Sequence, residues 1–174
     1  SISLMNQATV LLTLTLAVAA SLATPSAAVP QDTKAPTEKT MFHAKGTFDV
    51  KVKPTDLAGP AEDAQLGRMT LEKEFHGDLV GTGCGQMLTA MTPMQGSMAY
   101  VAIERVQGTL AGRRGTFVLQ HKGVMIRGGG PPLEITVVPD SGTDELVGLE
   151  GTLAITIADG RHDYDFQYSL PEKP

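Results

Sequence analysis

Three absences limit what this chain of 174 residues can be. It has one cysteine, Cys84, which excludes a disulfide within the chain, and we expect this residue to fill a small space in the core. Its 14 Lys and Arg are outnumbered by 19 Asp and Glu, and no basic run occurs, which argues against binding to nucleic acid or to a membrane surface. No stretch of helical length repeats apolar residues at i, i+3, i+4 and i+7, so helices are not expected.

The N-terminal segment has the pattern of a secretory signal peptide. The apolar run Thr9–Ala23 is too short for a comfortable membrane span of about 20 residues, and small residues follow it at 26–28. No Lys or Arg precedes the run, which is atypical, and an uncleaved anchor is the alternative. We expect a signal peptide over 1–28, cleaved after Ala28, and an exported protein, periplasmic or extracellular, with no stable membrane span. A flexible linker is expected over 29–40, the folded domain over 41–170 and a tail over 171–174.

From residue 41 onward, apolar and polar residues alternate with a period of two, which is typical of β-strands. Glycine stands at every second position of 81–85, which indicates strong coiling or a close backbone approach. The pattern predicts an all-β fold, a single antiparallel up-and-down β-barrel of lipocalin-like type with about eight strands. The expected strands cover 42–52, 69–75, 79–91, 98–109, 116–125, 133–138, 151–158 and 161–169.

Two turns allow the facing side chains to be predicted. Asp159-Gly160 is a typical two-residue hairpin turn, so Ile157 should oppose His162 and Ile155 should oppose Tyr164 on an apolar inner face. Around the turn 111–114, the expected register places Gly108 opposite Phe117, Val106 opposite Leu119 and Glu104 opposite His121. Tyr100 belongs to the same inner face, whereas Val101, Ile103 and Arg105 should face outward.

The inner face therefore contains a carboxylate and an imidazole, which are costly to bury unless they pair. Pairing would fix the tautomer of His121 or keep it protonated. One interpretation is a polar handle or acid/base pair in a ligand cavity, and the other is a buried pair that only fixes the register. We take Glu104, His121, Tyr100, His162 and Tyr164 as ligand-binding candidates. No cofactor or metal site is expected, because the four histidines show no short ligand spacing.

Five segments carry a resemblance to a known family. They are RMTLEK (68–73), FHGDL (75–79), YVAIERV (100–106), GTFVLQH (115–121) and VPDSGT (138–143). Over residues 41–170 the chain resembles domain-of-unknown-function family 3224, a widespread bacterial family. The resemblance implies a barrel like that of allene oxide cyclase, a fold class that includes cyclases holding an apolar substrate in the lumen. It implies no catalytic residues, and a shared fold does not establish an activity.

Three functions are compatible with this reading. The first is a binding module for a small apolar or amphipathic ligand in the lumen. The second is a cofactor-independent isomerase or cyclase that uses the same lumen. The third is a structural or homo-oligomer-forming envelope protein with a packed lumen. The first two require a cavity of several hundred Å³, as an order-of-magnitude estimate, and the third requires none. The catalytic residues, if any, stay unknown.

Overall fold

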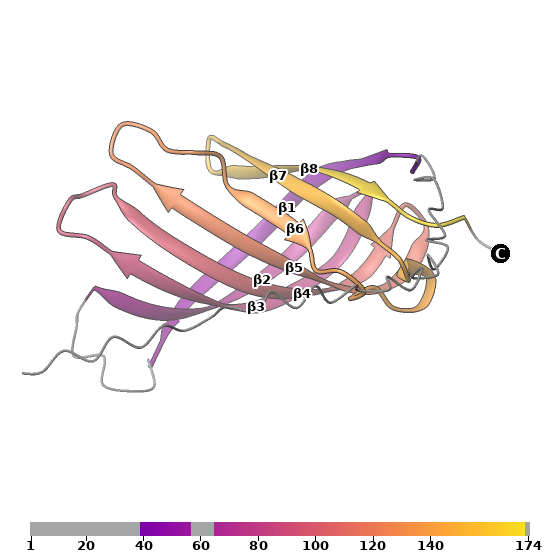
Figure 1. Ribbon diagram of the computed structural model, residues 1–174, viewed down its shortest axis with the longest axis horizontal. Coiled ribbons are helices and arrows are strands. Elements are labelled where there is room, and N and C mark those ends of the chain that lie inside the picture. Colours follow the sequence, from indigo (N-terminus) through magenta and orange to yellow (C-terminus); the bar gives the residue numbers. More distant parts are fainter. Residues whose placement is uncertain (1–38, 57–64, 173–174) are drawn as a thin grey trace, which may run out of the picture. The chain divides into compact units, whose positions relative to one another are not determined.

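The computed structural model describes residues 39–56 and 65–172, and these residues form a closed antiparallel barrel (Figure 1). Each strand pairs with the next along the chain, and β1 pairs with β8. This confirms the predicted eight-stranded up-and-down barrel. The strands are β1 (Phe42–Thr55), β2 (Leu66–Gly77), β3 (Leu79–Met91), β4 (Met98–Leu110), β5 (Arg113–Met125), β6 (Glu134–Val137), β7 (Glu150–Ala158) and β8 (Arg161–Ser169).

The predicted signal peptide, nearly all of the predicted linker and the last two residues of the tail lie outside the described residues. Within the described ranges, the only helix is the 3-10 turn η1 (Asp144–Leu146) between β6 and β7. None of the helical structure in those ranges has the length and apolar character needed to span a bilayer.

The β7–β8 hairpin has the predicted register. Asp159 and Gly160 both have positive φ, 53° and 79°, as a tight hairpin turn requires. Ile157 pairs with His162, and Ile155 pairs with Tyr164. The inward side of this hairpin is the apolar and aromatic side, because alternate residues of a strand point to opposite faces.

The β4–β5 hairpin differs from its predicted register by two residues. The turn is formed by Ala111 and Gly112 alone, both at positive φ (46° and 80°), so Leu110 pairs with Arg113. The predicted pairing of Glu104 with His121 is therefore wrong. So are the pairings of Val106 with Leu119 and of Gly108 with Phe117, because every partner shifts by two. A shift of two preserves side-chain parity, so the predicted inner and outer faces of both strands are correct.

In the structure, Glu104 pairs with Leu119, and His121 pairs with Ala102. The two-residue turn forms because Gly112 adopts a positive φ without strain, and the small side chain of Ala111 allows a positive φ at that position as well. The sequence AGRR contains no Asn-Gly or Asp-Gly pair, so the length of this turn was not evident from the residues.

The glycines of β3 bring neighbouring strands into close approach. A Cβ on Gly81 or Gly85 would overlap the backbone of β4, and one on Gly83 would overlap the side chain of Glu104. This agrees with the predicted close approach at alternate positions. The prediction that Cys84 is a core residue is wrong, because Cys84 is exposed on the outward face between the inward glycines.

One end of the barrel, where β2 meets β3 and β4 meets β5, is closed by packed apolar side chains. Fully buried residues fill it, including Leu79, Leu110, Phe117 and Phe166, and Leu146 of η1 packs against them. The ring of Tyr164 meets Phe75 edge to face at this end. This packed end is the hydrophobic core of the barrel.

The Pro-Asp-Ser-Gly-Thr segment completes the barrel wall next to a short strand. β6 has four residues and pairs with β7 through one residue pair, Thr136 and Thr152. Beyond it, the Ser141 hydroxyl accepts the backbone N–H of Val118 at 3.0 Å, and the Thr143 hydroxyl accepts that of Thr116 at 3.0 Å. These side chains thus replace strand partners for β5, which gives the segment a structural role.

We expect Tyr164→Phe to lower the free energy of unfolding by about 1–3 kcal/mol. The Tyr164 hydroxyl accepts the backbone N–H of Leu79 at 2.9 Å, and the substitution leaves this buried donor without its partner. Urea unfolding measures the effect. Tyr168→Phe is the matched control, because Tyr168 is a buried residue of the same strand whose hydroxyl forms no hydrogen bond within the described residues. Equal losses in the two variants would contradict the role given to this bond.

Candidate functional site

Three ionisable side chains meet inside the barrel, and we call them the lumen triad: Lys73, Glu104 and His121. Lys73 Nζ lies 2.8 Å from Glu104 Oε2, and His121 Nε2 lies 2.9 Å from the same oxygen. Their exposed fractions are 8%, 0% and 3%. The side chains come from β2, β4 and β5, so the cluster exists only in the folded barrel.

The lumen triad lies between aromatic and aliphatic residues. Lys73 Nζ sits 4.7 Å from the centroid of the Phe48 ring and 5.6 Å from that of Phe75. Contacts of this kind favour a cation, and they are stronger where water is excluded. Lys73 is therefore held by one carboxylate and two ring faces.

Glu104 is ionised despite its burial. Burial is the largest influence and would raise its pKa, but the His121 imidazole and the Lys73 ammonium beside it together outweigh burial, so the pKa lies below the ordinary carboxyl value. A carboxylate with a lowered pKa is a counter-ion and a hydrogen-bond acceptor. It is a poor general base, because acid–base catalysis works best with a pKa near the working pH.

Two polar atoms of the lumen triad have no hydrogen-bond partner within the described residues. They are Glu104 Oε1 and His121 Nε2. The short Nε2–Oε2 contact satisfies the distance of a hydrogen bond but not its direction, so it is a close polar contact and not a hydrogen bond. Glu104 Oε1 lies over Gly83, where any side chain would overlap it. The bare backbone of β3 thus makes room for the carboxylate between β2 and β4.

Lys73 is the member of the lumen triad that the sequence interpretation missed. The signal was present, because Leu71, Lys73 and Phe75 alternate with Glu72 and Glu74. Parity alone places Lys73 on the same side as Leu71 and Phe75, which are buried. Glu72 and Glu74 have the opposite parity and are exposed on the outer face.

The remaining candidate residues lie at different levels of the barrel. Tyr100 is half-buried on the inner face of β4, with its ring over Gly123, and burial raises its pKa. His162 is half-buried and packs against Phe48 with ring centroids 5.0 Å apart. Tyr164 is buried at the packed end, and its hydroxyl is bonded to the backbone there. The structure brings Glu104 and His121 together, but within the described ranges neither of them forms a hydrogen bond or ion pair with Tyr100, His162 or Tyr164.

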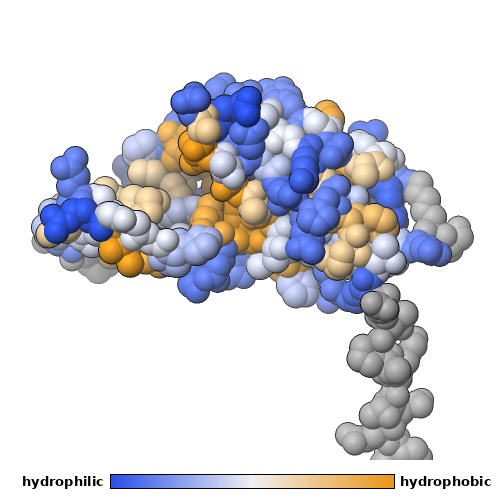
Figure 2. Space-filling model, turned by 90° about the horizontal axis from the view of Figure 1, so that it is seen from above, coloured by the Kyte–Doolittle hydropathy of each residue, from blue (hydrophilic) through white to orange (hydrophobic). Residues whose placement is uncertain are grey.

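The barrel end opposite the packed end is less closed. There, inward-facing residues keep partial or full exposure, as for Val50, Ile155 and Ile157, whereas inward residues at the packed end are buried. Figure 2 shows hydrophobic residues gathered at the floor of a hollow in one face of the molecule, with polar residues around it. The lumen triad lies between the packed end and this less closed half. Within the described ranges, no group of His, Cys, Asp and Glu residues has an arrangement suited to a metal ion.

We expect the stability of the protein to fall in acid partly because Glu104 must be protonated. Because its pKa is lowered in the folded state, ionised Glu104 stabilises the fold fully above its unfolded pKa of roughly 4.3. That contribution is lost as the pH falls through the lower folded-state pKa. Between about pH 6 and pH 3, Glu104→Gln should therefore lose less unfolding free energy than the parent protein in urea titrations.

The comparison with Glu104→Gln removes the contribution of carboxylates elsewhere in the barrel. Asp165 also has a lowered pKa, through hydrogen bonds from His43 and Lys45, but it is unchanged in both proteins and its effect cancels. Parallel pH profiles for the parent and the variant would show that Glu104 does not contribute.

The fold and the site together define a class of protein: a closed antiparallel barrel of eight strands that buries an ionic cluster in its interior. Residues 44–168 match DUF3224, a family described as proteins of unknown function. The chain belongs to this family, as the five segments indicated. No curated protein matches it.

A solved structure supports the same assignment. It is the crystal structure of a protein of unknown function from the DUF3224 family of Shewanella oneidensis MR-1. That protein is 45% identical to this chain, with a TM-score of 0.70, and the match covers 76% of this chain and 100% of the other. The similarity covers the barrel and assigns no ligand or reaction.

Proposed function

We propose that this protein binds a small apolar or amphipathic molecule in the lumen of the barrel, next to the lumen triad. The observation that carries the proposal is the buried cluster of Lys73, Glu104 and His121 in an otherwise apolar interior. Burying charges costs more free energy than packing aliphatic side chains of similar volume. If the interior served stability alone, aliphatic side chains at these three positions would be sufficient. A few polar groups in an apolar cavity are typical of ligand sites.

Glu104 Oε1 suggests how a ligand is recognised. It is a buried acceptor with no partner in the described part of the chain, and an ionised carboxylate can only accept hydrogen bonds. A hydroxyl or amine on an apolar molecule would satisfy it. Tyr100 and His162 would contact the ligand nearer the less closed end. The packed hydrophobic core would form the bottom of the binding site.

The lowered pKa of Glu104 favours binding over the cyclase or isomerase alternative. A carboxylate that Lys73 and His121 hold ionised is a weak proton acceptor and cannot donate a proton at neutral pH. The partial exposure of inward residues such as Val50 argues against the alternative of a fully packed lumen.

A fluorescence titration with 1-anilinonaphthalene-8-sulfonate tests the proposal. Val50 faces inward and pairs with Lys73, so Val50→Trp would fill the lumen beside the triad and weaken binding roughly ten-fold or more. Lys51→Trp is the matched control, because Lys51 is the next residue and is exposed on the outer face. Equal affinities in the two variants would rule out the lumen as the site.

Two conservative substitutions test whether Glu104 and His121 contact the ligand or only stabilise the barrel. Glu104→Gln and His121→Asn should each change the affinity for the probe, with the fold checked by circular dichroism. If both variants fold and bind like the parent, the lumen triad is not part of the site. Native mass spectrometry of the freshly purified protein would then identify the class of any molecule that co-purifies with the parent.

We also propose that the protein is exported. The apolar run Thr9–Ala23 and the small residues that follow support this. N-terminal sequencing of the protein from the periplasm or medium of an expressing bacterium should give Val29 as the first residue. Recovery of an uncleaved chain from the membrane fraction would favour the anchor instead.

A further inference from the structure

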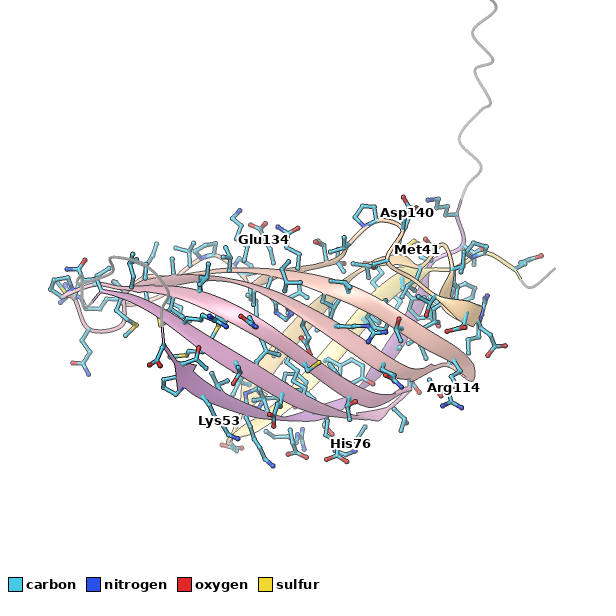
Figure 3. The ribbon with its side chains drawn as sticks, turned by 90° about the horizontal axis from the view of Figure 1, so that it is seen from below. Met41, Lys53, His76, Arg114, Glu134 and Asp140 are labelled. Carbon is cyan, nitrogen blue, oxygen red and sulfur yellow. The ribbon has the colours of Figure 1, made fainter. Side chains whose placement is uncertain are left out.

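The outer face of β2–β5 carries exposed hydrophobic residues that lie side by side. Figure 3 gives a view of the barrel from below with its side chains drawn. Leu88, Val101 and Ile103 are 53%, 52% and 54% exposed, and Leu88 pairs with Val101 across β3 and β4. Leu66 and Val124 extend the surface onto β2 and β5. Soluble monomers rarely expose large contiguous apolar patches, and such patches often mark contact surfaces.

Polar groups surround this apolar surface. Leu88, Val101 and Ile103 line a hollow of ≈ 680 Å³ together with Arg68, Gln86 and Gln120. Arg68 Nε is buried and has no hydrogen-bond partner within the described ranges. An apolar centre with a polar border is the usual anatomy of a protein–protein interface.

Opposite charges flank one strand of this wall. On the outer face, Cys84 of β3 pairs with Glu72 of β2 on one side and with Arg105 of β4 on the other. Across residues 39–56 and 65–172, neither Glu72 nor Arg105 forms an ion pair. Each charge is therefore available to a partner molecule.

We propose that the outer face of β2–β5 binds a second copy of this chain, with a two-fold axis that runs along β3. Such an axis exchanges the two sides of β3 between the copies. Glu72 of each copy then faces Arg105 of the other, Leu88 faces its own counterpart, and the patch is buried. An axis along β4 would place Arg105 against Arg105, so the charges select β3. The association does not depend on whether the lumen binds a ligand.

The single cysteine makes the geometry testable. The proposed axis places Cys84 of one copy beside Cys84 of the other, so the thiol-specific reagent bismaleimidoethane should join two parent chains. Cys84→Ser should not be cross-linked. In the matched variant Cys84→Ser with Thr156→Cys, the thiol lies on the exposed outer face of β7, and no cross-linked dimer is expected.

Charge reversal tests the pairing across the axis. By sedimentation velocity, the parent should be a dimer, and Glu72→Arg or Arg105→Glu should each weaken association roughly ten-fold or more. The double reversal should restore it, because each Arg then faces a Glu again. Both side chains are exposed, so the variants should keep the parent melting temperature.

Three results would overturn the proposal. One is a parent protein that stays monomeric at all concentrations, which would leave the patch to a different partner. Another is a dimer that the charge reversals do not weaken. The third is a dimer in which Thr156→Cys is cross-linked as readily as Cys84, because that would place the contact on another face.

Discussion

Replacing Glu104 with Ala is expected to lower the free energy of unfolding by about 3–5 kcal/mol, the usual cost of removing one partner from a buried ion pair. Glu104 is 0% exposed and is the anion that both Lys73 and His121 approach. Without it, the Lys73 ammonium keeps two aromatic rings but loses its counter-charge while it remains buried. A loss of this size is a large fraction of the stability of an ordinary domain.

Urea unfolding at neutral pH measures this loss, with Glu74→Ala as the control. Glu74 is an exposed carboxylate on the outer face of β2, and its removal should change stability by no more than about 0.5 kcal/mol. The double variant Glu104→Leu with Lys73→Met should recover much of the loss, because no buried charge is then left without a partner. If Glu104→Ala costs no more than Glu74→Ala, the ionic cluster does not stabilise the barrel.

Replacing Gly83 with Ala should cost about 2–3 kcal/mol, although the substitution adds one methyl group. The new Cβ would overlap Glu104 Oε1, so the carboxylate would have to move away from Lys73 and His121. Gly83 is buried, and its backbone is fixed between β2 and β4, so the strand cannot shift to relieve the overlap. The expected cost therefore comes mostly from the displaced ion pairs.

A double-mutant cycle tests this explanation. In the Glu104→Ala background the overlapping oxygen is absent, so Gly83→Ala should cost much less there than in the parent protein. Thr82→Ala, on the exposed outer face of the same strand, should be nearly neutral. Additive losses from Gly83→Ala and Glu104→Ala would show that the glycine is required for another reason, such as the coiling of β3.

The lumen triad shows how the fold creates a site from dispersed residues. Lys73 and Glu104 are 31 positions apart in the chain and lie on strands that β3 separates. Two side chains can meet across an intervening strand only if that strand presents little bulk toward the interior. The inward glycines at 83 and 85 leave that space. The glycine pattern therefore belongs to the site as much as to the barrel.

Part of this arrangement was predictable from the residues. Alternation with a period of two gave the strands and the inner and outer faces, because parity depends only on local backbone geometry. It placed Glu104 and His121 inside and Val101 and Ile103 outside, and the Asp159-Gly160 turn gave the register of the last hairpin. The same parity rule places Lys73 inside, because Lys73 alternates with Glu72 and Glu74 on β2.

The remaining features depend on distances between strands, which local patterns do not determine. The register of the β4–β5 hairpin followed from a two-residue turn that the sequence AGRR does not specify, so Glu104 and His121 are not paired residues.

The sequence by itself determined the fold class, the family and, on β4, β5, β7 and β8, which side chains face the interior. Only the tertiary structure decided which of those side chains meet, because closure of the barrel brings β2, β4 and β5 around one lumen and sets how far each strand is shifted past the next. The meeting of one cation, one carboxylate and one imidazole is a consequence of that closure.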